Sequence, residues 1–155
     1  METIISLVDR PDDDVRALVT ELEDVLSAEY PAEQRHGLSL DAIFQPHVKF
    51  FVAKVDGVAV GCGGVALFDG LAEVKRMYVR PSARGTGVAR AMLDRLEKEA
   101  RSAGIHTLSL ETGTKQEDAL RLYRRYGFTD CEAFGAYAKM EPHQIVASIF
   151  LTKKV

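Results

Sequence analysis

Cysteine is scarce in this chain of 155 residues and occurs in no metal-binding pattern. The two cysteines, Cys62 and Cys131, form no CxxC pair. Two isolated thiols make neither a disulfide framework nor a zinc site, so we interpret both as reduced residues of a cytosolic protein. The four histidines lie far apart without an HxxxH pair, and the sequence therefore predicts no metal site.

Long apolar runs and an excess of basic residues are also missing. No run approaches the roughly 20 apolar residues that cross a bilayer. The opening stretch METIISLVDRPDDD has neither the basic segment nor the apolar core of a secretory signal. A net charge of -3 and a pI near 5.8 argue against a general nucleic-acid binder. These absences predict a cytoplasmic protein with no nucleic-acid and no membrane partner.

The composition itself is that of an ordinary globular domain. Hydrophobic residues make up 46% of the chain and charged residues 28%. A chain of this length most simply forms one domain, residues 1–155. It buries about 70% of its unfolded surface on folding, so its core needs no disulfide or metal.

The hydrophobic pattern predicts a β-meander, then a βαβ unit, a further helix and two final strands. Asp56-Gly57 between two apolar runs predicts a tight hairpin, because both positions favour positive φ. Gly61, Gly63 and Gly64 weaken the following strand or let another group approach its backbone. Expected strands cover 3–8, 48–55, 58–68, 71–79, 107–111, 128–134 and 147–153; expected helices begin near residue 12, cover 39–44, run from 89 to Gly104, and cover 119–126. The fold class is therefore α/β (α+β), a mixed sheet covered by helices.

The stretch VRPSARGTGVARAML, residues 79–93, joins an expected strand to an expected helix. A helix N-terminus presents unpaired N–H groups and partial positive charge, and a small-residue loop before it makes an anion site. Gly85 and Gly87 keep side chains away, while Arg84 and Arg90 can add positive charge. The simpler alternative is a strand-to-helix turn with solvated arginines.

Two phosphate-binding motifs fit this loop poorly. It does not match GxxxxGK[ST]. Gly85 and Gly87 supply the first two glycines of GxGxxG, and Glu111 stands near the position of a ribose-binding acid. However, Arg90 occupies the third glycine position, and an antiparallel meander precedes the loop. A third interpretation, a site for the pantetheine and pyrophosphate of coenzyme A, rests on a family resemblance.

At this point the sequence resembles the GNAT acetyltransferase superfamily, in its small single-domain bacterial form. The segment 84–89, RGTGVA, fits the family signature Q/R-x-x-G-x-G/A, and ALRLYRRYGF at 119–128 resembles A-x-x-L-Y-x-x-x-G-F. The resemblance covers residues 48–134 well. It implies a central mixed, largely antiparallel twisted sheet with helices on both faces, and acetyl-CoA as co-substrate.

The resemblance also implies where acetyl-CoA binds. The fourth and fifth strands of the family splay apart, and the pantetheine arm pairs with backbone groups that correspond to Met77 and Val79. Gln116 stands where relatives often carry an asparagine that contacts this arm. The cofactor-binding residues carried over are Met77, Tyr78, Val79, Arg84, Gly85, Thr86, Gly87, Val88, Ala89, Arg90, Gln116 and Tyr123.

Acetyl transfer to an amine needs a base for the amine and an acid for the leaving thiolate. By the family match Tyr123 is the acid, although its helical spacing alone would make it a core tyrosine. Glu73 is the favoured base, and strand alternation is expected to place it on one face with Lys75, Met77 and Val79. The alternative is that Glu73 only pairs with a cation such as Lys75. Glu111 is the competing base, and in either case an ordered water can relay the proton.

The leading hypothesis is an N-acetyltransferase that moves an acetyl group to a primary amine of a small molecule or amino acid by direct attack in a ternary complex. The alternatives are a non-catalytic domain that senses acyl-CoA and regulates a protein partner, and an enzyme that acetylates proteins. Residues 30–46 and 134–144 are expected to form the acceptor cleft, with Phe134 and Tyr137 as candidate walls. The oligomeric state is left open between a monomer and a homodimer.

Overall fold

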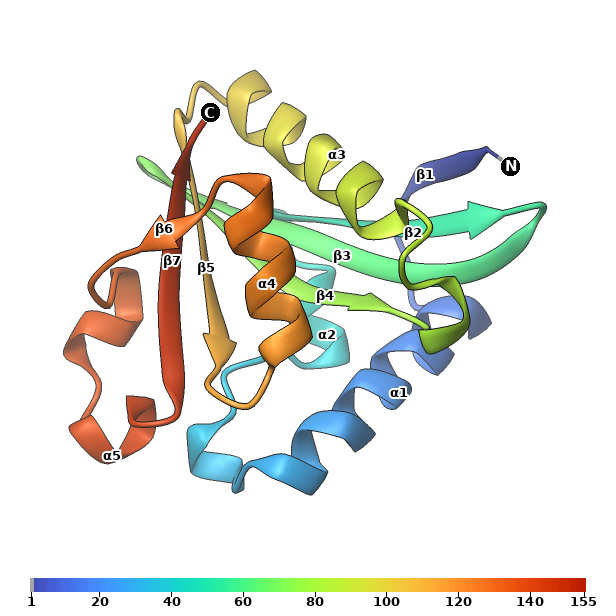
Figure 1. Cartoon of the computed structure of the whole chain (residues 1–155). Coiled ribbons are helices and arrows are strands. Elements are labelled where there is room, and N and C mark those ends of the chain that lie inside the picture. Colours follow the sequence, from blue (N-terminus) through green and yellow to red (C-terminus); the bar gives the residue numbers. More distant parts are fainter. Residues whose placement is uncertain (1) are drawn as a thin grey trace.

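The computed structural model describes residues 2–155, which form a seven-stranded sheet in the order β1-β2-β3-β4-β5-β7-β6 (Figure 1). The strands are β1 (Thr3–Val8), β2 (Val48–Val55), β3 (Val58–Phe68), β4 (Leu71–Val79), β5 (Thr107–Gly113), β6 (Thr129–Asp130) and β7 (Ser148–Lys154). The β4–β5 pair is parallel, and the other neighbours in this sheet are antiparallel. The expected mixed, largely antiparallel sheet is confirmed.

Helices cover both faces of the sheet (Figure 1). They are α1 (Asp13–Glu29), α2 (Leu40–Ile43), α3 (Val88–Ser102), α4 (Glu117–Tyr126) and α5 (Pro142–Ile145), with 3₁₀ turns η1 (Ala32–Gln34), η2 (Pro81–Ala83) and η3 (Gly135–Lys139). The first helix begins where expected, because the Asp12 side chain accepts a hydrogen bond from Val15 N at 2.9 Å. Its apolar stripe then faces the sheet.

Strand alternation divides the apolar residues between two cores. Phe50 and Val52 point towards α1, whereas Phe51 and Ala53 point towards α3 and α4. The Asp56-Gly57 hairpin is also confirmed, with φ of 51° and 79° at its two turn residues. Both faces of the sheet are therefore packed, and the functional site has to open at an edge or a gap between strands.

The strand expected at 128–134 was wrong in its length. Strand β6 contains only Thr129 and Asp130, which pair with Thr152 and Leu151 of β7. After Cys131 the chain leaves the sheet, turns at Gly135 with φ of 52°, and continues as η3 and α5. Residues 131–147 therefore form a folded-over segment at the C-terminal side of the sheet.

The expected alternation along β4 was also wrong. The register with β3 shifts between Cys62 and Gly64, and Arg76 adopts a positive φ of 52°. This bulge moves Met77 and Val79 onto the face of Ala72 and Val74, which packs towards α3. Glu73 and Lys75 remain on the opposite face, so the bulge separates the candidate base from the candidate pantetheine strand.

Candidate active site

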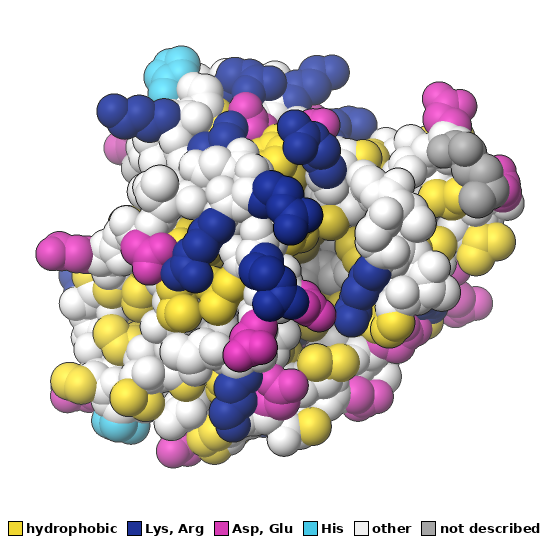
Figure 2. Space-filling view, viewed as in Figure 1, with side chains coloured by type: hydrophobic (Ala, Val, Ile, Leu, Met, Phe, Trp, Pro, Cys, Tyr) yellow, Lys and Arg dark blue, Asp and Glu magenta, His cyan; other side chains and the backbone are white. Residues whose placement is uncertain are grey.

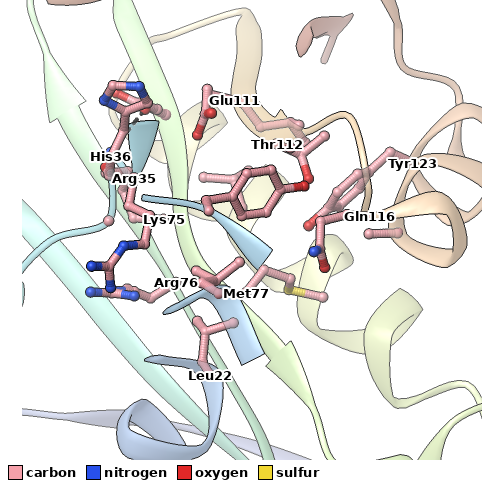
Figure 3. Close-up of a pocket in the computed structure, with 18 of the residues that line it drawn as sticks. Leu22, Arg35, His36, Lys75, Arg76, Met77, Glu111, Thr112, Gln116 and Tyr123 are labelled. Atoms are coloured by element: carbon pink, nitrogen blue, oxygen red, sulfur yellow. Dashed lines mark hydrogen bonds and ion pairs between the residues drawn. The ribbon is translucent and has the colours of Figure 1, made fainter. Parts of the chain in front are cut away.

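The site lies where β4 and β5 separate. Their pairing runs over only three residues and ends at Val74 and Leu110, while β4 continues to Val79 and β5 to Gly113. Beyond Val74 the edge of β4 that faces β5 has no strand partner among residues 2–155. A cavity of about 120 Å³ lies between the two strands, closed by the end of α1, the 34–37 loop and α4 (Figure 3).

Tyr30, at the end of α1, forms one wall of this cavity. Its hydroxyl accepts a hydrogen bond from Lys115 N at 2.8 Å. The ring lies so close to Gly113 that a Cβ there would overlap the Tyr30 hydroxyl. The end of β5 therefore needs a glycine for Tyr30 to close the pocket.

Tyr123 reaches the cavity from α4. Its ring is 6% exposed and packs edge-to-face on Phe128 at 5.8 Å between centroids. No described residue gives its hydroxyl a hydrogen-bond partner, yet Tyr123 lines the pocket. Burial, and then the nearby Glu111 carboxylate, raise the pKa of Tyr123, so the phenol is protonated at neutral pH.

Glu111 lies on β5 and also lines the pocket (Figure 3). Its Oε2 accepts a hydrogen bond from Ser148 Oγ at 2.6 Å. Burial raises the pKa of Glu111 above the usual carboxyl range, and the charge of Glu73 adds to this, although Ser148, His36 and Lys75 act in the opposite direction. In residues 2–155 no Lys or Arg forms an ion pair with it.

Glu73 has a different environment, although it lines the same pocket. It is 7% exposed and forms an ion pair with Lys75, with Nζ and Oε2 3.1 Å apart. The Tyr137 hydroxyl donates to the same Oε2 at 2.6 Å, and Lys75 Nζ also donates to Tyr137 and to the His36 carbonyl. These contacts match the alternative to a catalytic base, in which Glu73 is a carboxylate paired with Lys75.

The glycine-rich loop precedes α3 at the end of β4. Gly85 and Gly87 have φ of 76° and 89°, and a Cβ at either position would meet no atom within 4 Å. Gly87 caps α3 without a side-chain hydrogen bond, which leaves the first N–H groups of the helix free. Lys and Arg side chains gather over α4, beside this loop (Figure 2). The loop is thus open, positively charged and lined by free backbone donors.

The other predicted loop residues divide by what their side chains do. Arg84 Nε donates to the Val79 carbonyl at 3.1 Å, and the Arg90 guanidinium lies over the Tyr126 ring at 5.6 Å. Thr86 Oγ1 donates to the Ala83 carbonyl. Val88 is buried in the core on the α3 face and Ala89 is half-buried, so these two offer mainly backbone N–H groups.

Gln116 and Tyr78, the other two predicted cofactor-binding residues, lie in different places relative to the pocket. Gln116 lines the pocket at the start of α4, and its Nε2 donates to Glu29 Oε2 at 2.9 Å. The Tyr78 side chain points into the α1 core, where its hydroxyl donates to Glu21 at 3.1 Å. Tyr78 is not among the residues that line the cavity.

Of the two regions expected to form the acceptor cleft, residues 30–46 contribute to this pocket and residues 134–144 do not. Arg35, His36 and Arg76 line it, whereas Phe134 and Tyr137 do not. Tyr137 is buried against Phe134, Phe150 and His36 and supports Glu73 from behind. Residues 31–38 lack a hydrophobic period, so the sequence carried no signal for these individual side chains.

A model of the acetyltransferase (GNAT) family matches residues 16–128 of the chain. The chain belongs to the GNAT family. An IAA acetyltransferase from Azospirillum brasilense is 46% identical over 127 residues, covering 81% of this chain and 83% of that protein. An uncharacterized N-acetyltransferase, YsnE of Bacillus subtilis, is 34% identical over 91% of this chain and 92% of its own.

Solved structures of GNAT proteins have the same architecture. A putative acyl-CoA N-acyltransferase from Klebsiella pneumoniae superposes with a TM-score of 0.76 at 30% identity, over 98% of this chain and 97% of its own. The PaiA N-acetyltransferase from Thermoplasma acidophilum, solved in complex with coenzyme A, gives 0.75 at 16% identity over the whole of both chains and supports the fold alone. The protein is an acetyl-CoA-dependent N-acetyltransferase of the GNAT family. In residues 2–155 no helix is long and apolar enough to cross a membrane.

Proposed function

We propose that this GNAT enzyme acetylates a primary amine of a small molecule or amino acid, by direct attack within a ternary complex. The observation that carries the proposal is the position of Glu111 and Tyr123 in one cavity, beside the unpaired edge of β4. Within residues 2–155 this carboxylate has no ion pair and this phenol no hydrogen bond, which suits the two proton transfers of the reaction.

The glycine loop and the gap between β4 and β5 suit acetyl-CoA. The first backbone N–H groups of α3 have no side-chain cap and can hold its pyrophosphate. A Cβ added at Gly85 or Gly87 would meet no other described residue within 4 Å, so the space for the phosphates is open. The backbone of Met77 and the N–H group of Val79 are available to the pantetheine arm, because beyond Val74 no strand of residues 2–155 pairs with that edge of β4. When bound, acetyl-CoA supplies the activated thioester.

Glu111 is the base that the environment favours. A free alkylamine has a pKa near 10.4, so most of it is protonated at neutral pH and cannot attack. The carboxyl of Glu111 has a raised pKa and forms no ion pair within the described residues, which makes it a better proton acceptor than an ordinary carboxylate. Glu73 is neutralised by Lys75 and hydrogen-bonded to Tyr137, so we assign it the task of positioning this corner of the pocket.

Tyr123 is the acid. Its hydroxyl lines the pocket and is protonated at neutral pH, because burial raises the pKa of the phenol. The departing thiolate has a conjugate acid with a pKa near 8.5, close to that of a cysteine thiol. Proton donation from Tyr123 Oη to that sulfur prevents the reverse reaction and completes the transfer.

Release of free thiol from acetyl-CoA tests the proposal directly. The acceptors are small primary amines, amino acids, lysine-containing peptides and IAA, which the name of the Azospirillum relative suggests. Amine-dependent thiol release with formation of the N-acetyl product supports the proposal. Selective acetylation of peptides moves the enzyme to protein substrates, and acetyl-CoA binding without thiol release supports an acyl-CoA sensor that acts through a protein partner.

A further inference from the structure

Two buried guanidinium atoms at the acceptor end of the pocket lack a hydrogen-bond partner. They are Arg35 Nε and Arg76 Nη1, and within the described residues neither has an acceptor. Buried polar atoms are almost always paired in folded proteins, so each exception indicates a missing partner. Both arginines line the pocket that also contains Glu111 and Tyr123.

Arg76 is held in place by an unusual local structure. It occupies the β4 bulge with a positive φ of 52°, a strained conformation for a residue other than glycine. Its side chain is 6% exposed, and its Nε donates to the Leu38 carbonyl at 2.7 Å. A Cβ at Gly37 would overlap the guanidinium, so the loop above it requires a glycine. The bulge and the loop together fix one arginine at the end of the cavity.

The two arginines share a single carboxylate as their ion-pair partner. Arg35 and Arg76 share one carboxylate, Glu23, which lies 3.5 Å from Arg35 Nη1 and is also paired with Arg76. Lys75 is already paired with Glu73. Two guanidinium groups therefore share one carboxylate at this end of the pocket, and each has an N–H group without a partner in the described residues.

We propose that the acceptor is a small amine that also carries a carboxylate, such as an amino acid, and that Arg35 and Arg76 bind this carboxylate. The inference rests on the proposed function and names the substrate class of the same site. The unpaired N–H groups of the two arginines can donate charge-assisted hydrogen bonds to a carboxylate, which are stronger than those to a neutral polar group. Arg35, with a side chain 28% exposed, has room to turn its N–H groups towards such a ligand.

The arrangement of the pocket fits an acceptor with both groups. Figure 3 shows Arg35, His36, Lys75 and Arg76 on one side and Tyr123 and Gln116 on the other, with Glu111 between them. A carboxylate at the arginines leaves the amine on the side of Glu111, the proposed base. The cavity volume of about 120 Å³ is below the usual range for drug-sized ligands, which suits a small acceptor.

The test compares amino acids with their amides in the thiol-release assay. Alanine against alaninamide, and the same pair for other small amino acids, replaces the carboxylate by a neutral group of equal size. We expect kcat/KM at least tenfold higher for the acid. The Arg35→Gln variant should lose most of this preference, because its kcat/KM should fall much more for the acid than for the amide. Dividing the acid-to-amide ratio of the wild type by that of the variant cancels the different amine pKa values of the two acceptors.

Arg101→Gln is the matched control, because Arg101 pairs with Glu97 on α3 and its loss changes the net charge equally. Its acid-to-amide ratio should equal that of the wild type. Equal rates with acids and amides in the wild type, or an Arg35→Gln variant that slows both equally, would overturn the inference and leave amine acetylation standing. A tenfold preference for 1-aminoethylphosphonate over alanine would assign the arginines to a phosphonate and also overturn it. Absence of thiol release with every amine would overturn the proposed function itself.

Discussion

The ring of Tyr123 packs in the core, whereas its hydroxyl group is placed to take part in the reaction. Helical spacing places Tyr123 on the apolar stripe of α4 with Leu120, and its ring is indeed buried in the core. Its hydroxyl nevertheless lines the cavity and has no partner in the described chain. Packing and chemistry therefore belong to different atoms, and a mutation can separate them.

Removal of the Tyr123 hydroxyl should slow turnover without unfolding the protein. Tyr123→Phe keeps the ring on Phe128 and deletes only the proposed proton donor. We expect kcat to fall about 10- to 1,000-fold, within or just below the usual contribution of a general acid. The KM for acetyl-CoA and the melting temperature should change little. Steady-state kinetics and thermal unfolding measure both, and full activity in the folded variant would return Tyr123 to a purely structural role.

Sequence reasoning placed both candidate bases at the pocket and favoured Glu73, whereas our proposal from the structure favours Glu111. Glu73 and Glu111 end up in one cavity, as the strand order predicted. Their difference comes from partners remote in sequence, since Tyr137 lies 64 residues after Glu73 and Ser148 37 residues after Glu111. No periodicity in the sequence reports such long-range contacts, so the choice between the two carboxylates required the structure.

The pH dependence of activity should follow Glu111. A carboxyl accepts the amine proton only when ionised, and a raised pKa moves its ionisation to higher pH. The rate should therefore rise with pH through a range above that of an ordinary carboxyl. Glu111→Gln should lower kcat/KM by about 10²- to 10⁴-fold at neutral pH and recover in alkaline buffer, where the amine loses its proton unaided.

Glu73→Gln is the matched control for this profile. It removes the ion pair with Lys75 at constant size and should reduce the rate by less, with the pH dependence of the wild type retained. Rates measured from pH 5 to 10 with one good amine distinguish the two variants. If Glu73→Gln lost the increase in rate with pH and Glu111→Gln kept it, the base would instead be Glu73 on β4.

The bulge in β4 lies where β3 packs closely against β4 and α3. The glycines of β3 were expected to admit another group, and they do: a Cβ at Gly61 would lie 2.9 Å from the Tyr78 carbonyl, and one at Gly63 3.0 Å from Met92. Alternation alone predicted a regular strand, because a register shift depends on how β3 and α3 pack on β4. The helices and most strands followed from periodicity, whereas this irregularity, which separates Glu73 from Met77, did not.

The loop before α3 should bind acetyl-CoA through its backbone. Asparagine and aspartate both tolerate the positive φ of Gly87 and have the same shape. Gly87→Asp adds a negative charge beside the proposed phosphate site, and Gly87→Asn does not. We expect Gly87→Asp to weaken acetyl-CoA binding at least tenfold relative to Gly87→Asn, measured by calorimetry. Both variants should fold, because an acidic residue at a helix N-terminus is favourable. Equal affinities would remove the loop from the phosphate site.

The molecule as a whole is built around a weak seam between two halves of its sheet. Strands β1 to β4 form one half and β5 to β7 the other, and only the short β4–β5 pairing joins them in the described sheet. The C-terminal segment bridges the halves through Tyr137 to Glu73, and through a 2.7 Å contact between His36 Nε2 and the Gln144 carbonyl. Residues 131–147 have no apolar period, which is why their fold was not predicted from sequence.

Acetyl-CoA should bridge this seam and stabilise the fold. A ligand at 100 times its Kd adds about 2.7 kcal/mol to the free energy of unfolding. For a chain of this size that corresponds to a rise in Tm of roughly 5 to 11 °C. The fragment 3′-phosphoadenosine 5′-diphosphate keeps the phosphates for the loop but lacks the pantetheine arm, so it cannot pair with the free edge of β4. At equal concentrations it should raise Tm by much less in thermal unfolding experiments. An equal rise with the fragment would mean that the arm makes no net contact, and the gap between β4 and β5 would then not be the pantetheine slot.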